Sequence, residues 1–406
     1  MKRRACFATL LAAAMTVSMA ACGGSGSSTT TAAADTTAAA STAAETTAAA
    51  SGTTEAAGTE SKAAGGTTTE AGVEIADTTD WDTDAQFNKA MEVMDLSNPV
   101  DGCDEKSLVM STHCTETDSN YLYLLAFQKA VDTLSGGKMK VEGYANGQLF
   151  GQSDALGAIR QGTLDIANSD TALLGNYNPA AGVLDIPYIM TSREQAVACA
   201  QDEEFSDFID NMISGSDMHL LSVLPLNFRN SLCKNMDIDS VDDFKGFIMR
   251  TPEAPHTIAA FEAIGATPTV IPSGEAYTAL QTGVADGLEG HAEYMVLQKF
   301  YEVAKNYVQT QHVFTFTDYV MSKAVYDGLS DAQKEVVDRA AKEAQKVHIA
   351  YTSEMYPVRY AQLKAEGVKI TAFDTAPFIE ATKDYREKFI ADNNLQEMVD
   401  KIDSHK

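Results

Sequence analysis

The sequence predicts an α/β fold in two lobes of similar plan. From about residue 105, strand-like apolar segments alternate with segments of helical periodicity, the pattern of βαβ units and a parallel, doubly wound sheet. Ala158–Asp165 recurs as Ala279–Asp286, each time as an amphipathic helix, a glycine, a short strand and an aspartate. The chain is strongly helical from 331 to about 366, and a helix of that length can bridge both lobes.

Residues 1–22 have the features of an export signal. Three cationic residues at positions 2–4 precede the apolar run Phe7–Val17, which is too short to span a bilayer. Small residues then lead to Cys22, which resembles a bacterial lipobox. There Cys22 would be lipidated and become the new N-terminus, which would anchor the protein to the membrane. An ordinary signal peptide with a nearby cysteine is the alternative.

Residues 23–75 are almost entirely Ala, Thr, Ser and Gly, and no aromatic residue occurs between Phe7 and Trp81. Such a segment cannot bury enough apolar surface to offset its ordering entropy, so we expect a disordered linker. Its expected role is to let the body stand off the membrane. Residues 76–104 form an acidic transitional segment that the pattern does not place.

The charge balance restricts the partners. The 406 residues contain 57 acidic and 30 basic side chains, a formal net charge of −27. A polyanion of this size repels nucleic acid, which excludes it as a partner. An anionic ligand would need a local cationic site. Four cysteines follow the predicted anchor without the tight spacing of a metal site, and the sequence leaves open whether they are free or paired: Cys103, Cys114, Cys199 and Cys233.

The first lobe is expected over 105–227 and is completed by about 316–355. The helix at 120–135 is indicated by apolar residues at helical spacing and by the glycine pair that closes it. In order, its elements are a strand at Ser107–Cys114, a helix at 120–135, a strand at Lys138–Tyr144, a short helix capped by Ser153 and ending at Gly162, and a strand at Thr163–Asn168.

The second lobe is expected over 228–315 and is completed by about 356–400, after a strand at His219–Leu226. Pro357 is expected to kink or break the long helix. The lobe's elements are a strand at Phe247–Arg250, a helix from Pro255 to Gly265, a strand at Thr267–Ile271, a helix at 275–282 and a strand at 284–288.

Two arginines follow predicted strands, where open α/β sheets bind ligands. Arg250 ends the strand that begins at Phe247, and Arg229 follows the strand that ends at Leu226. A guanidinium makes paired, charge-assisted bonds to a carboxylate and stays charged when buried. We therefore expect a carboxylate site. The alternatives are an internal salt bridge for Arg250 and a surface or lobe-stabilising role for Arg229.

Two further pairs of polar residues lie near strand ends. Asn168 and Asp170 are candidate partners for ligand hydroxyls or amines, or else part of a polar turn. Glu289 and His291 could bind a metal or act as an acid–base pair, but one histidine without spaced partners is a weak signal. Nucleophile-elbow, dinucleotide and phosphate-loop motifs are missing. The sequence therefore favours binding without catalysis, cofactor or metal.

Several segments match a known family in its own order. The most specific are Tyr277–Gly287, Gln298–Val303 and Gly246–Pro252. Through them, residues 107–400 resemble the DctP-type solute-binding subunit of TRAP (tripartite ATP-independent periplasmic) transporters. The resemblance implies a two-lobed periplasmic-binding-protein (Venus flytrap) fold, a long helix spanning both lobes, and closure on a carboxylated ligand.

The resemblance also implies roles for single residues. The family's carboxylate-binding arginine matches Arg250, a second arginine that often helps matches Arg229, and an acidic residue used for ligand hydroxyls matches Asp170. After Asp-Gly the family usually reads Gln-Glu-Asn-Pro, whereas here 288–291 reads Leu-Glu-Gly-His, and its usual phenylalanine near 273 is altered, since 272–275 reads Pro-Ser-Gly-Glu. We therefore expect the far end of the ligand to be recognised differently, with His291 as a hypothetical contact.

These observations predict an extracytoplasmic lipoprotein that captures a small organic acid and delivers it to the membrane permease subunits of a TRAP-type transporter. A lipoprotein that senses the ligand for a signalling partner would have the same fold and site. An exported enzyme that uses Glu289 and His291 is a third possibility.

Overall fold

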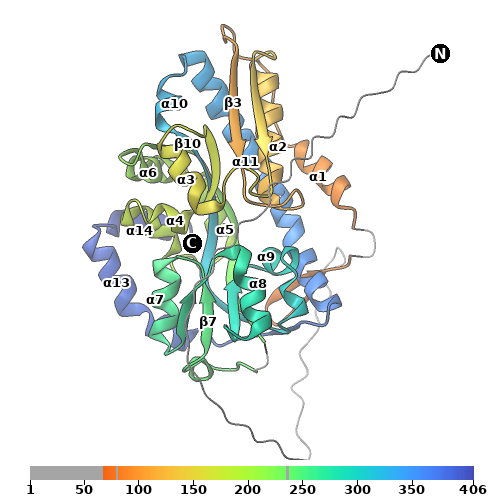
Figure 1. Ribbon diagram of the computed structural model, residues 1–406, viewed down its shortest axis with the longest axis vertical. Coiled ribbons are helices and arrows are strands. Elements are labelled where there is room, and N and C mark those ends of the chain that lie inside the picture. The colour runs from red at the N-terminus through yellow and green to blue at the C-terminus, as the bar shows by residue number, and fades with distance from the viewer. Residues whose placement is uncertain (1–66, 79–80, 235–236) are drawn as a thin grey trace, which may run out of the picture. The chain divides into compact units, whose positions relative to one another are not determined.

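The computed structural model describes residues 67–78, 81–234 and 237–406 (Figure 1). They belong to one compact unit, Gly58–Lys406. The predicted signal, Cys22 and most of the predicted linker lie outside the described residues. Among the helices described, none combines the length and hydrophobicity that crossing a bilayer requires.

In this part of the chain, nine strands form one mixed sheet in the order β4-β3-β5-β10-β6-β9-β7-β8, with β11 beside β10. Strands β1 (Thr67–Glu70) and β2 (Val73–Ala76) form a separate hairpin. The sheet strands are β3 (Lys106–Ser111), β4 (Met139–Tyr144), β5 (Ile166–Asp170), β6 (Met218–Cys233), β7 (Ile248–Thr251), β8 (Thr267–Val270), β9 (Gly287–Gly290), β10 (Asn306–Ser322) and β11 (Lys369–Thr371).

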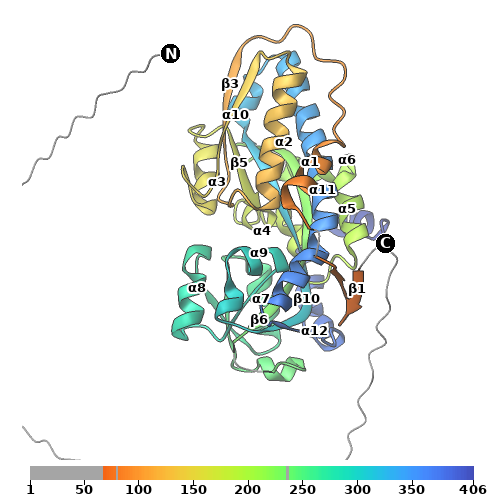
Figure 2. The ribbon, with the colours of Figure 1, turned by 90° about the vertical axis from the view of Figure 1, so that its right-hand side faces the viewer.

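Helices cover both faces of this sheet (Figures 1 and 2). The α-helices are α1 (Thr83–Met91), α2 (Ser119–Leu134), α3 (Gln152–Arg160), α4 (Thr171–Leu174), α5 (Arg193–Gln201), α6 (Glu203–Ser214), α7 (Pro255–Ala263), α8 (Ser273–Thr282), α9 (Ala292–Leu297), α10 (Lys323–Asp327), α11 (Asp331–Ala365), α12 (Ala376–Ala381), α13 (Lys383–Asp392) and α14 (Gln396–Asp403). Three 3₁₀ helices are η1 (Pro179–Asp185), η2 (Val241–Phe244) and η3 (Phe300–Glu302). Helix α3 begins after Gly151, so Ser153 is not its cap.

The two lobes repeat one plan, as the internal sequence repeat predicts. β3-α2-β4-α3-β5 and β7-α7-β8-α8-β9 each place the first strand between the other two, all parallel. In the first lobe, Asp165 Oδ2 accepts a hydrogen bond from the Val109 amide of β3 at 2.7 Å. In the second, Asp286 Oδ2 accepts from the Ile248 amide of β7 at 2.9 Å. The repeated aspartate thus fixes the third strand of each lobe beside the first.

The parallel order predicted from the alternation of strands and helices is found within each lobe, but the sheet as a whole is mixed. The long strands β6 and β10 pair antiparallel with each other, β10 pairs antiparallel with β5, and β6 with β9. These two strands carry one sheet from the first lobe into the second, so the predicted boundary at 227/228 falls inside β6. The sequence patterns of β6 and β10 do not reveal their pairing, because the partners are far apart in the chain.

Helix α11 spans both lobes, as predicted (Figures 1 and 2). Val336 and Val347 belong to the apolar cluster that includes α2, while Tyr360 and Leu363 belong to the cluster that includes α8 and α9. A capping box at Ser330 starts the helix. Pro357 lies inside the continuous helix, so it does not break it. The fold class predicted from the sequence is confirmed.

The N-terminal hairpin corrects the predicted linker, which extends too far into the body. Residues 67–75 belong to β1, the turn and β2, and α1 follows within the segment 76–104. Ala71 and Gly72 form the turn with φ of 49° and 82°, as a two-residue type I′ connection requires. Val73 and Ile75 alternate along β2 and are buried in the apolar cluster that includes residues of α11. Val73 and Ile75 thus give the end of a linker-like segment an apolar contact with the body.

The repeated glycine gives a stability test. Gly283 ends α8 in the left-handed region, with φ of 78°. Gly274 lies in the same helix with a helical backbone and open space where a Cβ would be. We expect Gly283→Ala to lower the free energy of unfolding by about 1–2 kcal/mol, and Gly274→Ala to raise it by up to about 1 kcal/mol. Urea unfolding followed by circular dichroism measures both. Equal effects would contradict the assigned cap.

Candidate functional site

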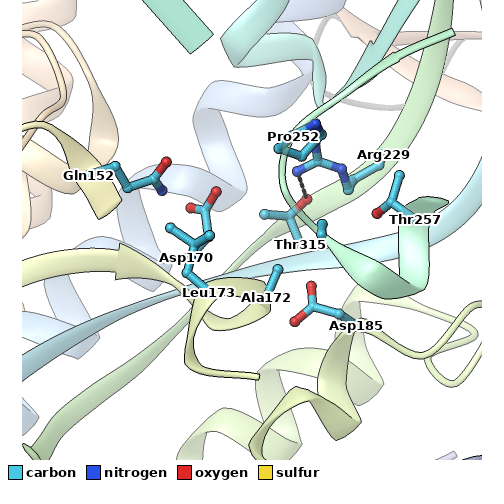
Figure 3. Close-up of a pocket in the computed structure, with 10 residues that line it drawn as sticks. Gln152, Asp170, Ala172, Leu173, Asp185, Arg229, Pro252, Thr257 and Thr315 are labelled. Carbon is cyan, nitrogen blue, oxygen red and sulfur yellow. Dashed lines mark hydrogen bonds between the residues drawn. The ribbon is translucent and has the colours of Figure 1, made fainter. Parts of the chain in front are cut away.

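A cavity of about 590 Å³ lies between the two lobes. Its lining includes residues from the strand ends of both. Four of the six predicted ligand contacts line it: Arg250, Arg229, Asp170 and His291. Asn168 and Glu289 are not among its lining residues. A smaller pocket of about 20 Å³ adjoins it and shares Asp170 and Arg229 (Figure 3).

Arg250 is a buried cation without an anionic partner among the described residues. It lies near the end of β7, is 2% exposed, and donates Nε–H to the Ile271 carbonyl oxygen at 2.9 Å. That carbonyl fixes the side chain and leaves the two terminal NH₂ groups of the guanidinium without a hydrogen-bond partner in this part of the chain. The internal salt bridge considered from the sequence is absent there. A buried unpaired charge is costly, and an anion in the cavity would relieve that cost.

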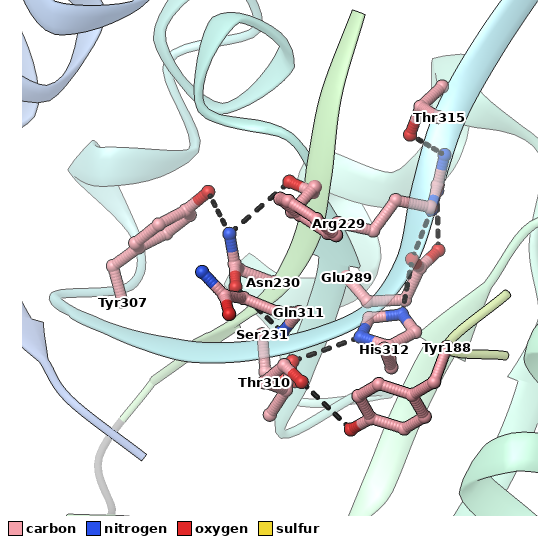
Figure 4. A network of polar contacts seen from close by, with 11 residues as sticks. Tyr188, Arg229, Asn230, Ser231, Glu289, Tyr307, Thr310, Gln311, His312 and Thr315 are labelled. Carbon is pink, nitrogen blue, oxygen red and sulfur yellow. Dashed lines mark hydrogen bonds and ion pairs between the residues drawn. The ribbon is translucent and has the colours of Figure 1, made fainter. Parts of the chain in front are cut away.

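Arg229 is already paired (Figure 4). Its Nε and one NH₂ group donate to the two carboxylate oxygens of Glu289 at 2.5 and 2.6 Å. His312 Nε2 lies 3.2 Å from the same carboxylate. Burial raises the pKa of Glu289, but Arg229 and His312 outweigh burial and hold the pKa well below its usual value. The charge of Arg229 is therefore balanced inside the protein.

The environment of this ion pair is a network that joins β6, β9 and β10. His312 Nδ1 lies 2.9 Å from the Thr310 hydroxyl, which lies 3.3 Å from the Ser231 hydroxyl. Tyr188 donates its hydroxyl hydrogen to the Thr310 carbonyl oxygen at 2.9 Å (Figure 4). Polar groups that are buried together in this way hold one another in a fixed geometry.

Asn168 and Asp170 have different surroundings although they are two residues apart. The buried amide of Asn168 donates to the Thr317 hydroxyl at 2.8 Å and to the Asp318 carbonyl oxygen at 3.1 Å, which ties β5 to β10. Asp170 is half-buried at the end of β5, and its carboxylate has no hydrogen-bond or ion-pair partner among the described residues. Of the two, only Asp170 presents an unused polar group to the cavity.

The two departures from the family pattern meet at one side chain. A Cβ at Gly290 would lie 2.9 Å from a ring carbon of Tyr294, so the Tyr294 ring occupies the space that a larger residue would need. The Tyr294 hydroxyl lies 2.8 Å from the Ser273 hydroxyl.

His291 Nδ1 lies 3.3 Å from the Tyr356 hydroxyl on α11, and burial lowers the pKa of His291 to about 3. His291 is therefore a neutral cavity group at physiological pH.

Sequence reasoning did not identify the acidic wall near α2. Asp118 lines the cavity and accepts a hydrogen bond from the Asn120 amide as the cap of α2. Burial, with the charge of Glu293, raises the pKa of Asp118 to about 8. Glu293 on α9 binds the Ser119 hydroxyl at 2.8 Å and Arg359 of α11 at 3.2 Å. An aspartate after a strand at a helix start is the signal that could have identified Asp118.

Within the described ranges, no group of three or more histidine, cysteine or acidic side chains is arranged to hold a metal ion. His113 lies 3.6 Å from Cys114 but has no further ligand of that kind. The cysteines that the sequence left unassigned are free thiols in the structure: Cys103, Cys114, Cys199 and Cys233.

Comparison with known proteins gives a consistent result. Residues 110–393 match the DctP family, described as bacterial extracellular solute-binding protein, family 7. The sialic acid-binding periplasmic protein SiaP of Vibrio cholerae is 27% identical over 67% of this chain and 84% of its own length. The 2,3-diketo-L-gulonate-binding periplasmic protein YiaO of Escherichia coli is 26% identical over 71% of this chain and 88% of its own.

Solved structures agree with this match. A TRAP periplasmic solute-binding protein from Bordetella bronchispeptica, with density interpreted as pantoate, is 28% identical with a TM-score of 0.70, over 74% of this chain and 100% of that one. One from Chromohalobacter salexigens, with bound D-glucuronate, is 25% identical with a TM-score of 0.70 over the same shares. With a family match across most of the described body and the same fold in these relatives, this chain belongs to the DctP family of TRAP solute-binding proteins.

Proposed function

We propose that this protein captures a small organic acid outside the cytoplasm and delivers it to the membrane permease of a TRAP-type transporter. The observation that carries the proposal is Arg250, a buried cation with no anionic partner in the described chain, in the wall of a cavity of about 590 Å³. The relatives support it, because glucuronate, pantoate and sialic acid all carry a carboxylate.

Closure of the lobes provides the mechanism. The ligand's carboxylate pairs with the terminal NH₂ groups of Arg250 in an open form. The first lobe then closes over the second and removes water, which strengthens the ion pair by lowering the local dielectric constant. The ligand favours the closed form only as far as it binds that form better. The permease would recognise the closed form and accept the ligand from it.

Arg229 has a supporting role in this proposal. Its Nε and one NH₂ group hold Glu289, and its other NH₂ group lies 3.5 Å from the Thr315 hydroxyl. Because it lines the cavity, it can still donate to a neutral oxygen of the ligand. The main effect of Arg229 is to pair with Glu289, so that Glu289 does not compete with the carboxylate of the ligand for a cationic side chain. Glu289 thus acts through Arg229 and does not itself contact the ligand.

The signal and Cys22 support the remainder of the proposal. A lipidated Cys22 would hold the protein at the outer face of the cell membrane, and the segment after it would let the body reach the permease. Capture and delivery would then take place beside the membrane.

The arginine can be tested directly. We expect Arg250→Ala to weaken binding of the natural organic acid by about 2–5 kcal/mol, because truncation leaves a carboxylate without its partner in a dry cavity. Denaturing mass spectrometry of the gently purified protein identifies the acid, and isothermal titration calorimetry measures its affinity. Arg339→Ala is the control, because this half-buried arginine of α11 is not among the residues that line the cavity. Unchanged affinity in Arg250→Ala would refute the proposed role.

The Arg229–Glu289 pair should appear in the pH dependence of stability. Glu289→Gln leaves a buried guanidinium unpaired and should cost about 3–5 kcal/mol at pH 7. Since the pKa of Glu289 is lowered on folding, its contribution is complete above the unfolded pKa of about 4.3 and is lost as pH falls through the folded value. The difference from wild type should therefore shrink in urea unfolding below about pH 4. A constant difference, or an equal loss in the exposed control Glu380→Gln, would contradict the assignment.

The anchor has a separate test. Cys22→Ala should move the exported protein from the membrane fraction to the soluble fraction and remove the mass of the attached lipid. Ultracentrifugation and intact-mass measurement of the expressed protein show both changes. Cys103→Ala is the control, because that thiol is free and lies within the body. Membrane association that persists without Cys22 would exclude this anchor.

A further inference from the structure

The cavity has unpaired groups of opposite charge in its two lobes. Arg250 belongs to β7 of the second lobe, whereas Asp170 ends β5 of the first lobe, and its carboxylate has no partner in the described chain. Asp185, at the end of η1 in the first lobe, is 4% exposed, and its Oδ2 atom has no hydrogen-bond partner. Buried polar groups in proteins are almost always satisfied. Unused groups beside a cavity therefore indicate what the cavity binds.

Asp185 lies beside a small pocket that adjoins the main cavity. It lines the small pocket of about 20 Å³, together with Thr257 and Thr315 (Figure 3). That pocket shares Gln152, Asp170, Leu173, Arg229 and Pro252 with the large cavity, so the two are contiguous. Its volume suits one group of the size of a water molecule, such as a hydroxyl or an ammonium.

The charge near this pocket favours a cation. Arg229 is a cation in the lining of this pocket, but its charge is already balanced by Glu289. Asp318, beside η1, is also buried with an unpartnered Oδ2. Burial raises the pKa of both Asp185 and Asp318; the charge of Arg229 opposes this at Asp185, whereas the charge of Asp170 adds to the effect at both. These carboxyl groups share a region that lacks an unpaired positive charge among the described residues.

The remaining cavity groups do not supply that charge. Asp154 and Glu253 line the cavity and are exposed and acidic. Burial lowers the pKa of His113 and of His291, so both are neutral at physiological pH. A second carboxylate on the ligand would be repelled by the acidic side chains of the cavity lining, which include Asp154, Asp170 and Glu253. A hydroxyl could donate to only one of the two carboxyl groups, whereas an ammonium has three donors and a full charge.

We propose that the ligand is a zwitterion whose carboxylate pairs with Arg250 and whose protonated amine binds Asp170 and Asp185 in the first lobe. Such a ligand would bridge the lobes, so that closure brings both charged ends to their partners at once. The inference rests on the proposed function and specifies the ligand class for that same site.

Two series of acids test the proposal on the full-length protein. Each series keeps the number of carbon atoms and changes only the group at the end opposite the carboxylate. The first series is 4-aminobutyrate, 4-hydroxybutyrate and succinate, and the second is 6-aminohexanoate, 6-hydroxyhexanoate and adipate. Thermal-shift measurements and isothermal titration calorimetry give the affinities. We expect the amino acid in at least one series to bind about tenfold or more tightly than its hydroxy and dicarboxylate counterparts, because charge-assisted bonds are about twice as strong as neutral ones.

Variants test whether Asp170 and Asp185 cause that preference. Asp170→Asn and Asp185→Asn should each reduce the preference for the amino acid about tenfold and leave the hydroxy acid nearly unchanged. The control is Asp207→Asn, which changes an exposed side chain of α6 and should alter neither affinity. If Asp185→Asn does not fold, the variant of the half-buried Asp170 alone decides whether the acidic side chains cause the preference.

The outcomes separate the two proposals. Equal or tighter binding of the hydroxy acid or the dicarboxylate, dependent on Arg250, would reject the zwitterion and keep the organic-acid function. Amino-acid binding that is indifferent to both aspartates would also reject the zwitterion. If no acid of either series binds, and none accompanies the purified protein, both proposals fail.

Discussion

The buried ion pair between Arg229 and Glu289 determines the chemistry of the cavity. Both side chains are removed from water, and each satisfies the other through two hydrogen bonds. Without Glu289, two unpaired arginines would face the cavity, and the site would suit a dianion. With it, Arg250 is the unpaired cation of the described lining. The pair also links β6 to β9, so the same contact that sets the charge of the site holds the second lobe to the long strand.

Much of this could be predicted from the sequence, because the signals were local. Helical spacing, glycine stops and the repeated Ala158–Asp165 pattern identified the plan of each lobe, and the strand-end rule placed Arg250 and Asp170 at the cavity. Glu289 was expected as a contact because it lies near a strand end. The sequence could not show that Arg229 comes within bonding distance and takes its charge.

What could not be predicted depends on contacts between distant segments. The direction of β6 and β10 follows from pairing across about 90 residues, which no local pattern encodes. The unused Oδ2 of Asp185 appears only once η1 packs beside β10. The hairpin at 67–76 is ordered by α11, which lies more than 250 residues further along the chain.

The shared strands β6 and β10 also affect how the body can come apart. Each lobe's sheet is completed by a strand that continues into the other lobe, and α11 crosses the same junction. A cut at residue 227 would divide β6 and expose unpaired backbone in both halves, so neither fragment would keep a closed hydrogen-bond ladder. We therefore expect the two lobes to unfold together, and neither to fold when it is expressed alone.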